Sequence, residues 1–508
     1  METSIRTAAG GPADGDQDGL LELAVGDVAH GGWCVAREPG GRVVFVRHAL
    51  PGERVRARVT DTTARFARAE AVEILQASPD RAEPPCPHAR PDGCGGCDWQ
   101  HATPEAQRRL KAEVVRQQLR RIAGLDREVT VEPLAGDSGG LGWRTRVRFS
   151  VGPGGAAGLL KHRSHEVVEI GACPIAHPLV NETGVTGQRW PHVSSLEIAV
   201  APGPGERAAI VTPAAGRRQA TGGGPRAAAP ETPAGQAAAM LAGRADTVLT
   251  TGRGGKLTAA RGRGYLHQRA AGRTWRVGAG TFWQVHPGAA DALTAAVLDA
   301  LHPAPGDVAL DLFCGAGLFA GALAEAVGPA GVVIGVEADR AAVRDARHNL
   351  RRTPWARIHH GDVATVLARQ TVPARQTGPA KRTVPAKRTV PAKQTVSAGP
   401  ATPAAQPGDG WPEPVLAVLD PPRAGAGRTV IEALLGRPGA ARTAHLRRVA
   451  YVSCDPATLA RDVAVFGELG WELAGLRAFD AFPMTHHLEC VATLAPAESG
   501  QRSPGGGG

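Results

Sequence analysis

Short runs of alternating apolar and polar residues occupy the first part of the chain. Between residues 20 and 75 these runs are separated by Gly-Gly and Pro-Gly turn signals, and their spacing predicts a small OB-like β-barrel. The preceding residues, 1–18, are polar and glycine-rich, and we expect them to be disordered. The first folded unit is therefore predicted to span residues 19–78.

The second part of the chain has a mixed pattern. A helix is predicted over residues 105–123, and β-type runs begin near residue 142. Residues 213–238 are rich in proline, alanine and glycine, which predicts a disordered insertion. We expect a central β-rich domain, which also contains a group of cysteines, over residues 79–275.

The last part of the chain has the order strand, glycine-rich turn, helix, strand. This order is typical of an open parallel α/β sheet, so a Rossmann-like domain is predicted over residues 276–495. Within it, residues 369–398 form five hexads related to KRTVPA, with a proline in each of the first four. Proline at this frequency excludes a helix or a central strand, so residues 365–410 are predicted to be a low-complexity insertion. A disordered tail is expected over residues 496–508.

Basic residues outnumber acidic ones. The chain has 58 Lys and Arg against 48 Asp and Glu, a formal charge of +10, which suits a polyanionic partner such as RNA. A composition biased toward Arg, Ala, Gly and Pro is an alternative explanation. The predicted barrel has eight arginines that we expect to be exposed and to contact RNA: Arg37, Arg42, Arg47, Arg54, Arg56, Arg58, Arg65 and Arg68.

The cysteine content and hydropathy indicate a cytoplasmic protein. Eight cysteines in 508 residues are too few for a disulfide scaffold, and the first residues have no apolar leader segment. The most apolar long stretch, residues 316–336, is interrupted by Glu325 and several glycines, so no membrane span is expected. In the reducing cytoplasm, cysteines can act as ligands or nucleophiles.

Three strand ends in the α/β region have the pattern of a cofactor site. The sequence VALDLFCGAGLFA is an apolar strand followed by a turn in which Gly315 and Gly317 allow close approach of a ligand. Glu337 ends the next strand, where a carboxylate can accept both ribose hydroxyls, and Asp362 ends a third strand within reach of an adenine amino group. Because the turn lacks both GxGxxG and the GKS or GKT of a phosphate loop, S-adenosylmethionine fits better than NAD or ATP.

A candidate nucleophile follows another predicted strand. An apolar run over residues 448–453 leads into Cys454, and Asp455 and Pro456 then have the residue types of a helix N-cap and first turn. We expect the positive end of this helix to lower the pKa of the Cys454 thiol. The alternative is a small buried residue at a strand end, without chemical function.

Two carboxylates are predicted to lie near this thiol. Asp420 ends the strand in VLDPPRAG, and Glu489 stands between two apolar runs in FPMTHHLECVATL. Since the carboxyl ends of parallel strands meet at one crevice, we expect the thiol, the carboxylates and the cofactor turn to converge. A thiol, a base and a methyl donor are what methylation of uracil carbon 5 requires, because a thiolate adding to carbon 6 makes carbon 5 nucleophilic.

The motifs DLFCGAGLF, LDPPRAG, YVSCDPATLARD and FPMTHHLE together resemble those of the RNA uracil-5-methyltransferases, which act on tRNA or 23S rRNA. The resemblance extends over nearly the whole chain, and the first predicted barrel resembles a TRAM domain, an RNA-binding barrel. It implies that Cys454 is the nucleophile and Glu489 the base. It also implies a cofactor pocket lined by Gln284, Phe313, Glu337 and Asp420, with Leu318 at a position where the family often has Asn.

Four further cysteines form a candidate metal site. Cys86, Cys94 and Cys97 lie close together, and Cys173 lies far downstream. Four thiolates suit zinc or a 4Fe–4S cluster, and free structural thiols are a third reading. Zinc sites usually pair two CxxC motifs, whereas related rRNA uracil methyltransferases have a cluster on a similar cysteine pattern, so the resemblance favours a structural 4Fe–4S cluster.

Two other classes of protein fit the sequence less well. Radical-SAM RNA methylthiotransferases combine a TRAM domain with a cluster but need CxxxCxxC, whereas seven residues separate Cys86 from Cys94 here. A non-enzymatic RNA-binding protein would not need Cys454 or Glu489. We expect a monomeric enzyme acting on RNA, with 23S rRNA favoured over tRNA because the tRNA enzymes typically lack both the TRAM domain and the four cysteines.

Overall fold

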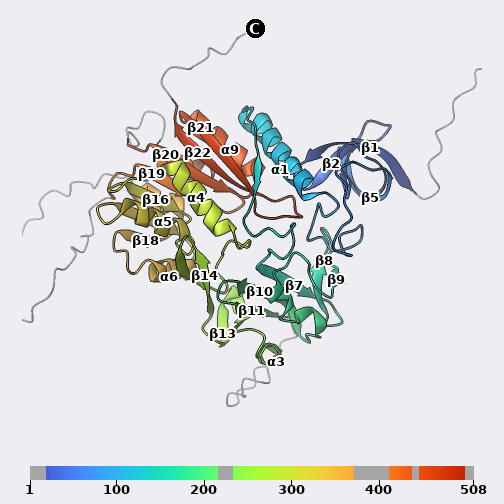
Figure 1. Ribbon diagram of the computed structural model, residues 1–508, viewed down its shortest axis with the longest axis horizontal. Helices are drawn as coiled ribbons and strands as arrows, with labels where there is room; N and C mark the ends of the chain where they lie inside the picture. The colour runs from blue at the N-terminus through green and yellow to red at the C-terminus, as the bar shows by residue number, and fades with distance from the viewer. Residues whose placement is uncertain (1–18, 215–232, 371–410, 437–444, 498–508) are drawn as a thin grey trace, which may run out of the picture.

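The computed structural model describes residues 19–214, 233–370, 411–436 and 445–497, and it contains three units (Figure 1). Most of the predicted disorder, and most of the low-complexity insertion, fall on segments outside the described residues: 1–18, 215–232, 371–410 and 498–508. Within the described ranges, no helix has the length and apolar character needed to cross a membrane.

The first unit is a closed five-stranded barrel in the order β1-β2-β3-β5-β4, as the sequence predicts. Its strands are β1 (Leu20–Ala29), β2 (Trp33–Arg37), β3 (Val43–Arg47), β4 (Arg54–Thr62) and β5 (Phe66–Gln76). Alternate positions of these strands face inward, so small apolar side chains fill the narrow interior. They include Ala36, Val44, Val46, Val55, Ala57, Ala67 and Ala69.

The second unit is a seven-stranded sheet in the order β13-β12-β11-β10-β7-β8-β9. Its strands are β7 (Arg146–Val151), β8 (Ala157–Leu160), β9 (Val167–Glu169), β10 (Val193–Ala201), β11 (Glu206–Pro213), β12 (Thr247–Thr251) and β13 (Leu257–Arg261). The short helices α2 (Pro178–Asn181) and α3 (Pro233–Met240) accompany it, so residues 233–238 of the predicted insertion are helical. The hairpin β14 (Tyr265–Ala270) with β15 (Arg273–Gly278) leads into the third unit.

The third unit is an eight-stranded sheet in the order β18-β17-β16-β19-β20-β22-β21-β6. Its strands are β16 (Val308–Leu312), β17 (Val332–Glu337), β18 (Ala356–His360), β19 (Leu416–Leu419), β20 (Arg448–Ser453), β21 (Trp471–Asp480), β22 (Glu489–Pro496) and β6 (Val131–Pro133). The strands from β18 to β20 are parallel, and β22 runs antiparallel to β20 and β21. This arrangement confirms the predicted α/β class.

Helices cover both faces of this sheet because its central strands are apolar on both sides. In β19, Leu416 and Val418 join the core on the face of α4 (Ala289–Leu301), α5 (Leu318–Val327) and α6 (Arg340–Asn349). Ala417 and Leu419 face the opposite core, which contains α7 (Val363–Gln370), α8 (Gly427–Leu435) and α9 (Pro456–Glu468).

One helix and one strand from the first third of the sequence belong to the third unit. Strand β6 pairs in parallel with β21, and α1 (Pro104–Gln118) packs on α9 and also contacts β1 of the barrel (Figure 1). Thr103 caps α1 by accepting a hydrogen bond from the Ala106 N–H. The sequence assigns both segments to the central domain, because pairing between strands so distant in the chain leaves no local pattern.

Candidate active site

Five predicted site residues stand at neighbouring strand ends. Strands β17, β16, β19, β20 and β22 are adjacent in that order. They place Glu337, Phe313, Asp420, Cys454 and Glu489 along one edge of the sheet. In the pairing of β20 with β22, Ser453 lies opposite Cys490, so the next position on each strand brings Cys454 beside Glu489. The predicted convergence of thiol, carboxylates and cofactor turn is present in the fold.

The turn after β16 is held by the neighbouring strand. The N–H groups of Phe313 and Cys314 both donate to the Val336 carbonyl, at 2.9 and 3.0 Å. Phe313 has a φ of 68°, an unfavourable conformation for a residue with a side chain. Glu337 Oε2 accepts from the Gly315 N–H at 2.9 Å. The carboxylate predicted to accept ribose hydroxyls is therefore fixed against the glycine-rich turn.

Helix α5 begins directly after this turn. Gly317 is its N-cap, with a φ of 92°, and a Cβ at this position would lie 3.3 Å from the Ala346 Cβ. The positive φ therefore favours glycine here, and a Cβ would also crowd Ala346. The side chain of Leu318 is buried in the hydrophobic core around α4 to α6, so its role in cofactor binding remains a prediction that its packing does not favour.

Asp362 follows β18 at the same edge of the sheet, whereas Gln284 lies in a loop and lines a small cavity beside the central sheet. Gln284 is buried in the loop before α4, where the N–H and hydroxyl of Thr145 both donate to the Val285 carbonyl, at 2.9 and 2.8 Å. Asp362 is exposed and accepts hydrogen bonds from the Thr365 N–H and hydroxyl. Phe282, which no sequence pattern singles out, is 65% exposed two residues before Gln284. An exposed aromatic ring of this kind can stack on a base, but local periodicity does not reveal its exposure.

The site is rich in buried acids. Burial, with a contribution from the Asp420 charge, raises the pKa of Glu489 well above its usual value. Burial and the Glu337 charge raise the pKa of Asp420 to about 7. Deeper in the sheet, burial raises the pKa of Asp311 to about 8, and its Oδ2 accepts the Ala320 N–H at 2.6 Å. Close carboxyl groups in a buried site resist ionising together.

The predicted lowering of the Cys454 pKa is wrong. Asp455 does cap α9 by accepting from the Thr458 N–H at 2.8 Å, and Pro456 is the first residue of the helix. However, burial and the Glu489 charge raise the pKa of Cys454 to about 12, although Arg423 lowers it. Burial and the nearby acids outweigh the effect of Arg423, so the thiol is mainly protonated near pH 7.

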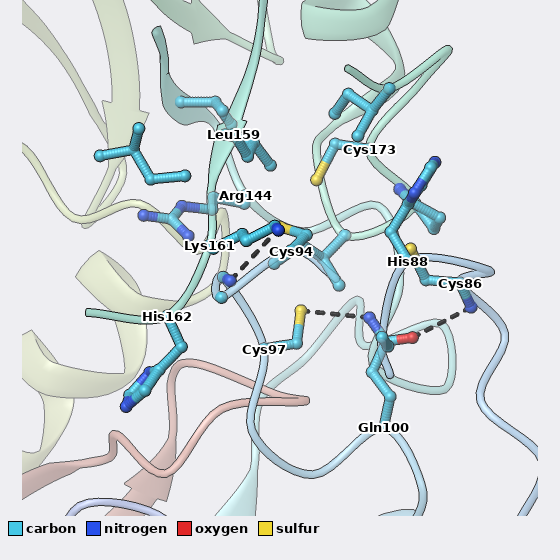
Figure 2. A pocket seen from close by; sticks show the side chains of 18 of the residues that line it. Cys86, His88, Cys94, Cys97, Gln100, Arg144, Leu159, Lys161, His162 and Cys173 are labelled. Atoms are coloured by element: carbon cyan, nitrogen blue, oxygen red, sulfur yellow. Dashed lines mark hydrogen bonds between the residues drawn. The ribbon is translucent and has the colours of Figure 1, made fainter. Parts of the chain in front are cut away.

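One cavity of about 330 Å³ lies between residues 86–97, here called the cysteine loop, and the central seven-stranded sheet. It is lined by all four predicted ligands, Cys86, Cys94, Cys97 and Cys173. Figure 2 shows the four thiols turned toward a common space. The Gly96 N–H donates to the Cys94 sulfur at 3.3 Å, and Gln100 Nε2 donates to the Cys97 sulfur at 3.1 Å. Among the described residues, no three His, Cys, Asp or Glu side chains are grouped as ligands of a single ion.

Of the eight barrel arginines predicted to be exposed, Arg37, Arg54, Arg58 and Arg65 are exposed, whereas Arg42, Arg56 and Arg68 are half-buried. Arg47 is only 2% exposed, because its guanidinium is buried against other units of the protein. Five more of the eight arginines form ion pairs with a nearby carboxylate: Arg42, Arg54, Arg56, Arg58 and Arg68. The sequence pattern does not predict these acidic partners, which lie on neighbouring strands and loops.

A cationic hairpin, residues 252–264, was not singled out from the sequence. It follows β12, includes β13 at the edge of the central sheet, and has no acidic residue. All five residues of β13 are exposed. Its four basic side chains are exposed as well: Arg253, Lys256, Arg261 and Arg263. A Cβ at Gly280 would touch Leu257, so the hairpin adjoins the loop that contains Phe282 and Gln284.

Comparisons with known proteins follow the same division of the chain. Residues 20–72 match the TRAM domain family, residues 303–370 a methyltransferase domain family, and residues 415–496 the tRNA (Uracil-5-)-methyltransferase family. An uncharacterized RNA methyltransferase of Streptomyces avermitilis is 46% identical over 490 residues, covering 94% of this chain and 99% of its own length.

Two better-defined proteins are also similar. The 23S rRNA (uracil(1939)-C(5))-methyltransferase RlmD of Halomonas elongata is 31% identical over 498 residues, covering 96% of this chain and 92% of that protein. The crystal structure of Pyrococcus abyssi tRNA (uracil-54, C5)-methyltransferase, in complex with S-adenosyl-L-homocysteine, has a TM-score of 0.61 and 18% identity, covering 94% of this chain and 99% of that one. At 18% identity, the similarity to the Pyrococcus abyssi structure shows a shared fold alone.

Proposed function

Because the chain belongs to the RNA uracil-5-methyltransferase family, we propose that it methylates carbon 5 of a uridine through a covalent bond between Cys454 and carbon 6. S-adenosylmethionine is the methyl donor of this enzyme class. The observation that carries the proposal is the strand register that sets Cys454 beside Glu489, with the cofactor turn two strands away from β20.

Each step has a group to perform it. The Cys454 thiol first gives its proton to solvent, and the resulting thiolate adds to carbon 6 of the ring, so that electron density moves to carbon 5. Carbon 5 takes the methyl group as the sulfonium carbon–sulfur bond breaks. Glu489 then removes the carbon 5 proton, and the bond to Cys454 breaks as the ring double bond re-forms. Glu489 must be ionised to act as this base, and the burial that raises its pKa makes its carboxylate a stronger proton acceptor.

The residues around the donor have separate roles in this proposal. Glu337 accepts the ribose hydroxyls, and the backbone at Gly315 and Gly317 approaches the amino acid portion of the donor. Gln284, Phe313 and Asp420 line the remaining pocket, and Asp362 lies toward the adenine. All of these groups come from one chain, so a monomer carries a complete site.

The test uses RNA fragments and labelled S-adenosylmethionine. Cys454→Ala should abolish 5-methyluridine formation while S-adenosylmethionine affinity stays within about threefold, because the thiol acts on the RNA and not on the donor. Glu489→Gln should accumulate a protein–RNA adduct that survives denaturing gels. Cys490→Ala, which removes a neighbouring buried thiol, is the matched control and should still turn over. Turnover by Cys454→Ala would contradict the proposal.

We propose 23S rRNA as the substrate, with tRNA as the alternative. The support is the similarity to the RlmD protein over nearly the full length of both chains, together with the four clustered cysteines. In either RNA the target base must leave its stack to reach Cys454. Methylation assays on matched rRNA and tRNA transcripts separate the two, and exclusive methylation of tRNA would overturn the rRNA assignment.

We propose that Cys86, Cys94, Cys97 and Cys173 hold a 4Fe–4S cluster. A tetrahedral zinc ion with bonds of about 2.3 Å draws its sulfurs to within about 4 Å of one another. No such close group of three thiols occurs among the described residues, and the support for the cluster is that all four thiols line one cavity. The N–H groups that point at two of the sulfurs suit cluster ligands. When bound, the cluster supplies structural cross-linking, since methyl transfer needs no electron.

A further inference from the structure

The barrel contacts the loop that contains the nucleophile. His30 lies in the turn between β1 and β2, and its Nε2 is 3.2 Å from Asp455 Oδ2. Asp455 directly follows Cys454, and its other oxygen caps α9 through the Thr458 N–H at 2.8 Å. Burial tends to raise the pKa of Asp455, but the His30 and Thr458 hydrogen bonds hold it far below its usual value. One carboxylate therefore joins the barrel to the start of the catalytic helix.

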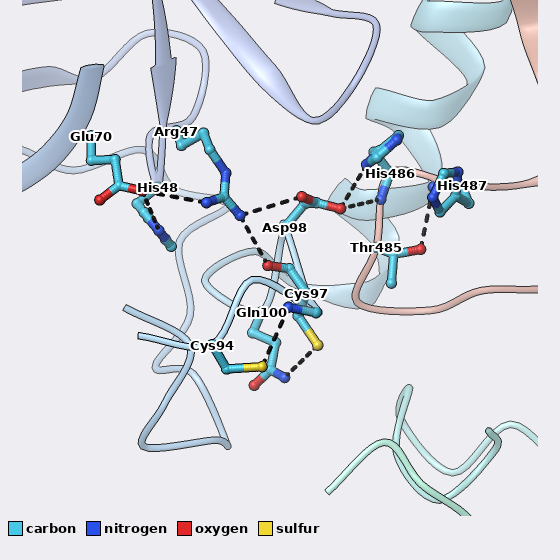
Figure 3. A network of polar contacts seen from close by, with 11 residues as sticks. Arg47, His48, Glu70, Cys94, Cys97, Asp98, Gln100, Thr485, His486 and His487 are labelled. Atoms are coloured by element: carbon cyan, nitrogen blue, oxygen red, sulfur yellow. Dashed lines mark hydrogen bonds and ion pairs between the residues drawn. The ribbon is translucent and has the colours of Figure 1, made fainter. Parts of the chain in front are cut away.

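A second contact leads from the barrel toward the base. Arg47, at the end of β3, contacts Asp98 Oδ1 at 3.4 Å and Glu70 at 3.3 Å. Asp98 Oδ2 accepts from the His486 N–H at 3.1 Å and lies 2.6 Å from His486 Nδ1. Figure 3 shows Asp98 between Arg47 and His486. His486 stands three residues before Glu489.

The loop preceding Glu489, residues 481–488, depends on partners outside its own sheet. The N–H groups of Asp98 and Trp99 both donate to the Met484 carbonyl, at 3.0 and 3.1 Å. The Met484 N–H donates to Gln107 on α1 at 2.8 Å. Met484 has a φ of 67°, which a non-glycine residue keeps only when its surroundings enforce it. The conformation of this loop is therefore set by Asp98 and Trp99, which directly follow Cys97, and by Gln107 on α1.

We propose that the TRAM barrel is a positioning element of the active site. Through His30–Asp455 and Arg47–Asp98–His486 it fixes the two loops that carry Cys454 and Glu489. This inference rests on the proposed function for the roles of those two residues. Nucleophile and base must meet the adjacent carbons 6 and 5 of one ring, and a displacement of about 1 Å at a reacting group can cost about a hundredfold in rate. A barrel that only holds RNA would need neither contact.

The two roles differ in what a variant changes. A barrel that only binds RNA affects RNA affinity, whereas a positioning barrel affects the chemical step once RNA is saturating. The experiment therefore measures the single-turnover rate of adduct formation at saturating RNA, together with the affinities for RNA and S-adenosylmethionine. The full-length protein is used throughout.

His30→Ala should slow adduct formation about tenfold or more at saturating RNA, with both affinities within about threefold. His30→Gln, whose amide can still donate to Asp455, should restore part of the rate. The matched control is His445→Ala, which removes an exposed histidine 2.9 Å from Glu413 and should leave the rate unchanged. Asp98→Asn provides a second variant on the other path and should also slow adduct formation.

Unchanged saturated rates in both His30→Ala and Asp98→Asn, with weakened RNA binding, would overturn the positioning role. Equal losses in His30→Ala and His30→Gln would also count against it, because they would indicate general destabilisation. If the unmodified protein forms no adduct, the proposed function fails instead. Each variant should have the same melting temperature as the unmodified protein, so that a slower rate is not due to a loss of overall stability.

Discussion

The pKa of the Cys454 thiol depends on charges that strands far apart in the sequence bring to it. Its strand-end position, the cap at Asp455 and the proline after it are local features, and the sequence predicts them correctly. The direction of its pKa shift is not local, because it follows from burial and from Glu489 on an antiparallel neighbour strand. A sequence pattern gives the position of a thiol but not the acids that will surround it.

The raised pKa leads to a prediction about pH. Below a pKa of about 12 the Cys454 thiolate is the minor form, so the single-turnover rate of adduct formation should rise about tenfold per pH unit around neutrality. Arg423 lowers this pKa, and Arg423→Gln should therefore reduce the rate at each pH without changing the slope. Rates followed in a stepwise pH series test this. A rate that is level from about pH 6 to 9 would indicate a thiolate formed before RNA binds.

At the scale of elements, the sequence predicts the barrel, the glycine-rich turn, the strand ends and helix α9. It does not place α1 and β6 in the third unit, because β6 pairs with β21 more than three hundred residues later. Nor does it predict that Asp98, Gln107 and Lys111 would hold the loop before Glu489. Lys111, fully buried, donates to Asp480 at 2.5 Å and to the Phe482 carbonyl at 3.0 Å. Such tertiary partners have no periodicity of their own.

The cationic hairpin, residues 252–264, gives the prediction at this scale. Its four cations lie beside the loop of Phe282 and Gln284, so we expect it to contact RNA phosphates near the target base. Changing Arg253, Lys256, Arg261 and Arg263 to Gln should weaken RNA binding and reduce the salt slope by up to about 3, at about 0.7 per phosphate contact on single-stranded RNA. Binding measured across a salt series gives the slope.

The control variant lies in the third unit, at the amino end of β18 and thus at the other end of the strands from the candidate site. Arg351 and Arg352 are exposed directly after α6 ends, away from the strand ends that carry the site. Changing both to Gln also removes positive charge but should leave the salt slope nearly unchanged. Equal slopes for the hairpin variant and the unmodified protein would remove the hairpin from the RNA interface.

At the scale of the whole molecule, the cysteine loop joins all three units. Cys94 and Cys97 face the central sheet across the cavity, the Cys97 carbonyl lies 3.4 Å from Arg47 of the barrel, and Asp98 contacts the loop before Glu489. Gly95 fits only as glycine, because a Cβ would lie 2.4 Å from the His162 nitrogen. A cluster on these four cysteines would therefore stabilise the junction of the three units.

Because Asp98 contacts residues 481–488, we expect loss of the cluster to make this loop more mobile. Anaerobically purified protein should absorb broadly at about 400 nm, and Cys94→Ser should lose that absorption. Because Asp98 follows Cys97, the variant should also show faster amide hydrogen exchange in residues 481–488 and a lower melting temperature. Cys34→Ala removes a buried thiol inside the barrel, outside the cavity, and should keep the absorption. Stoichiometric zinc in place of iron would contradict the cluster, whereas absorption loss with unchanged exchange would separate the cluster from the loop.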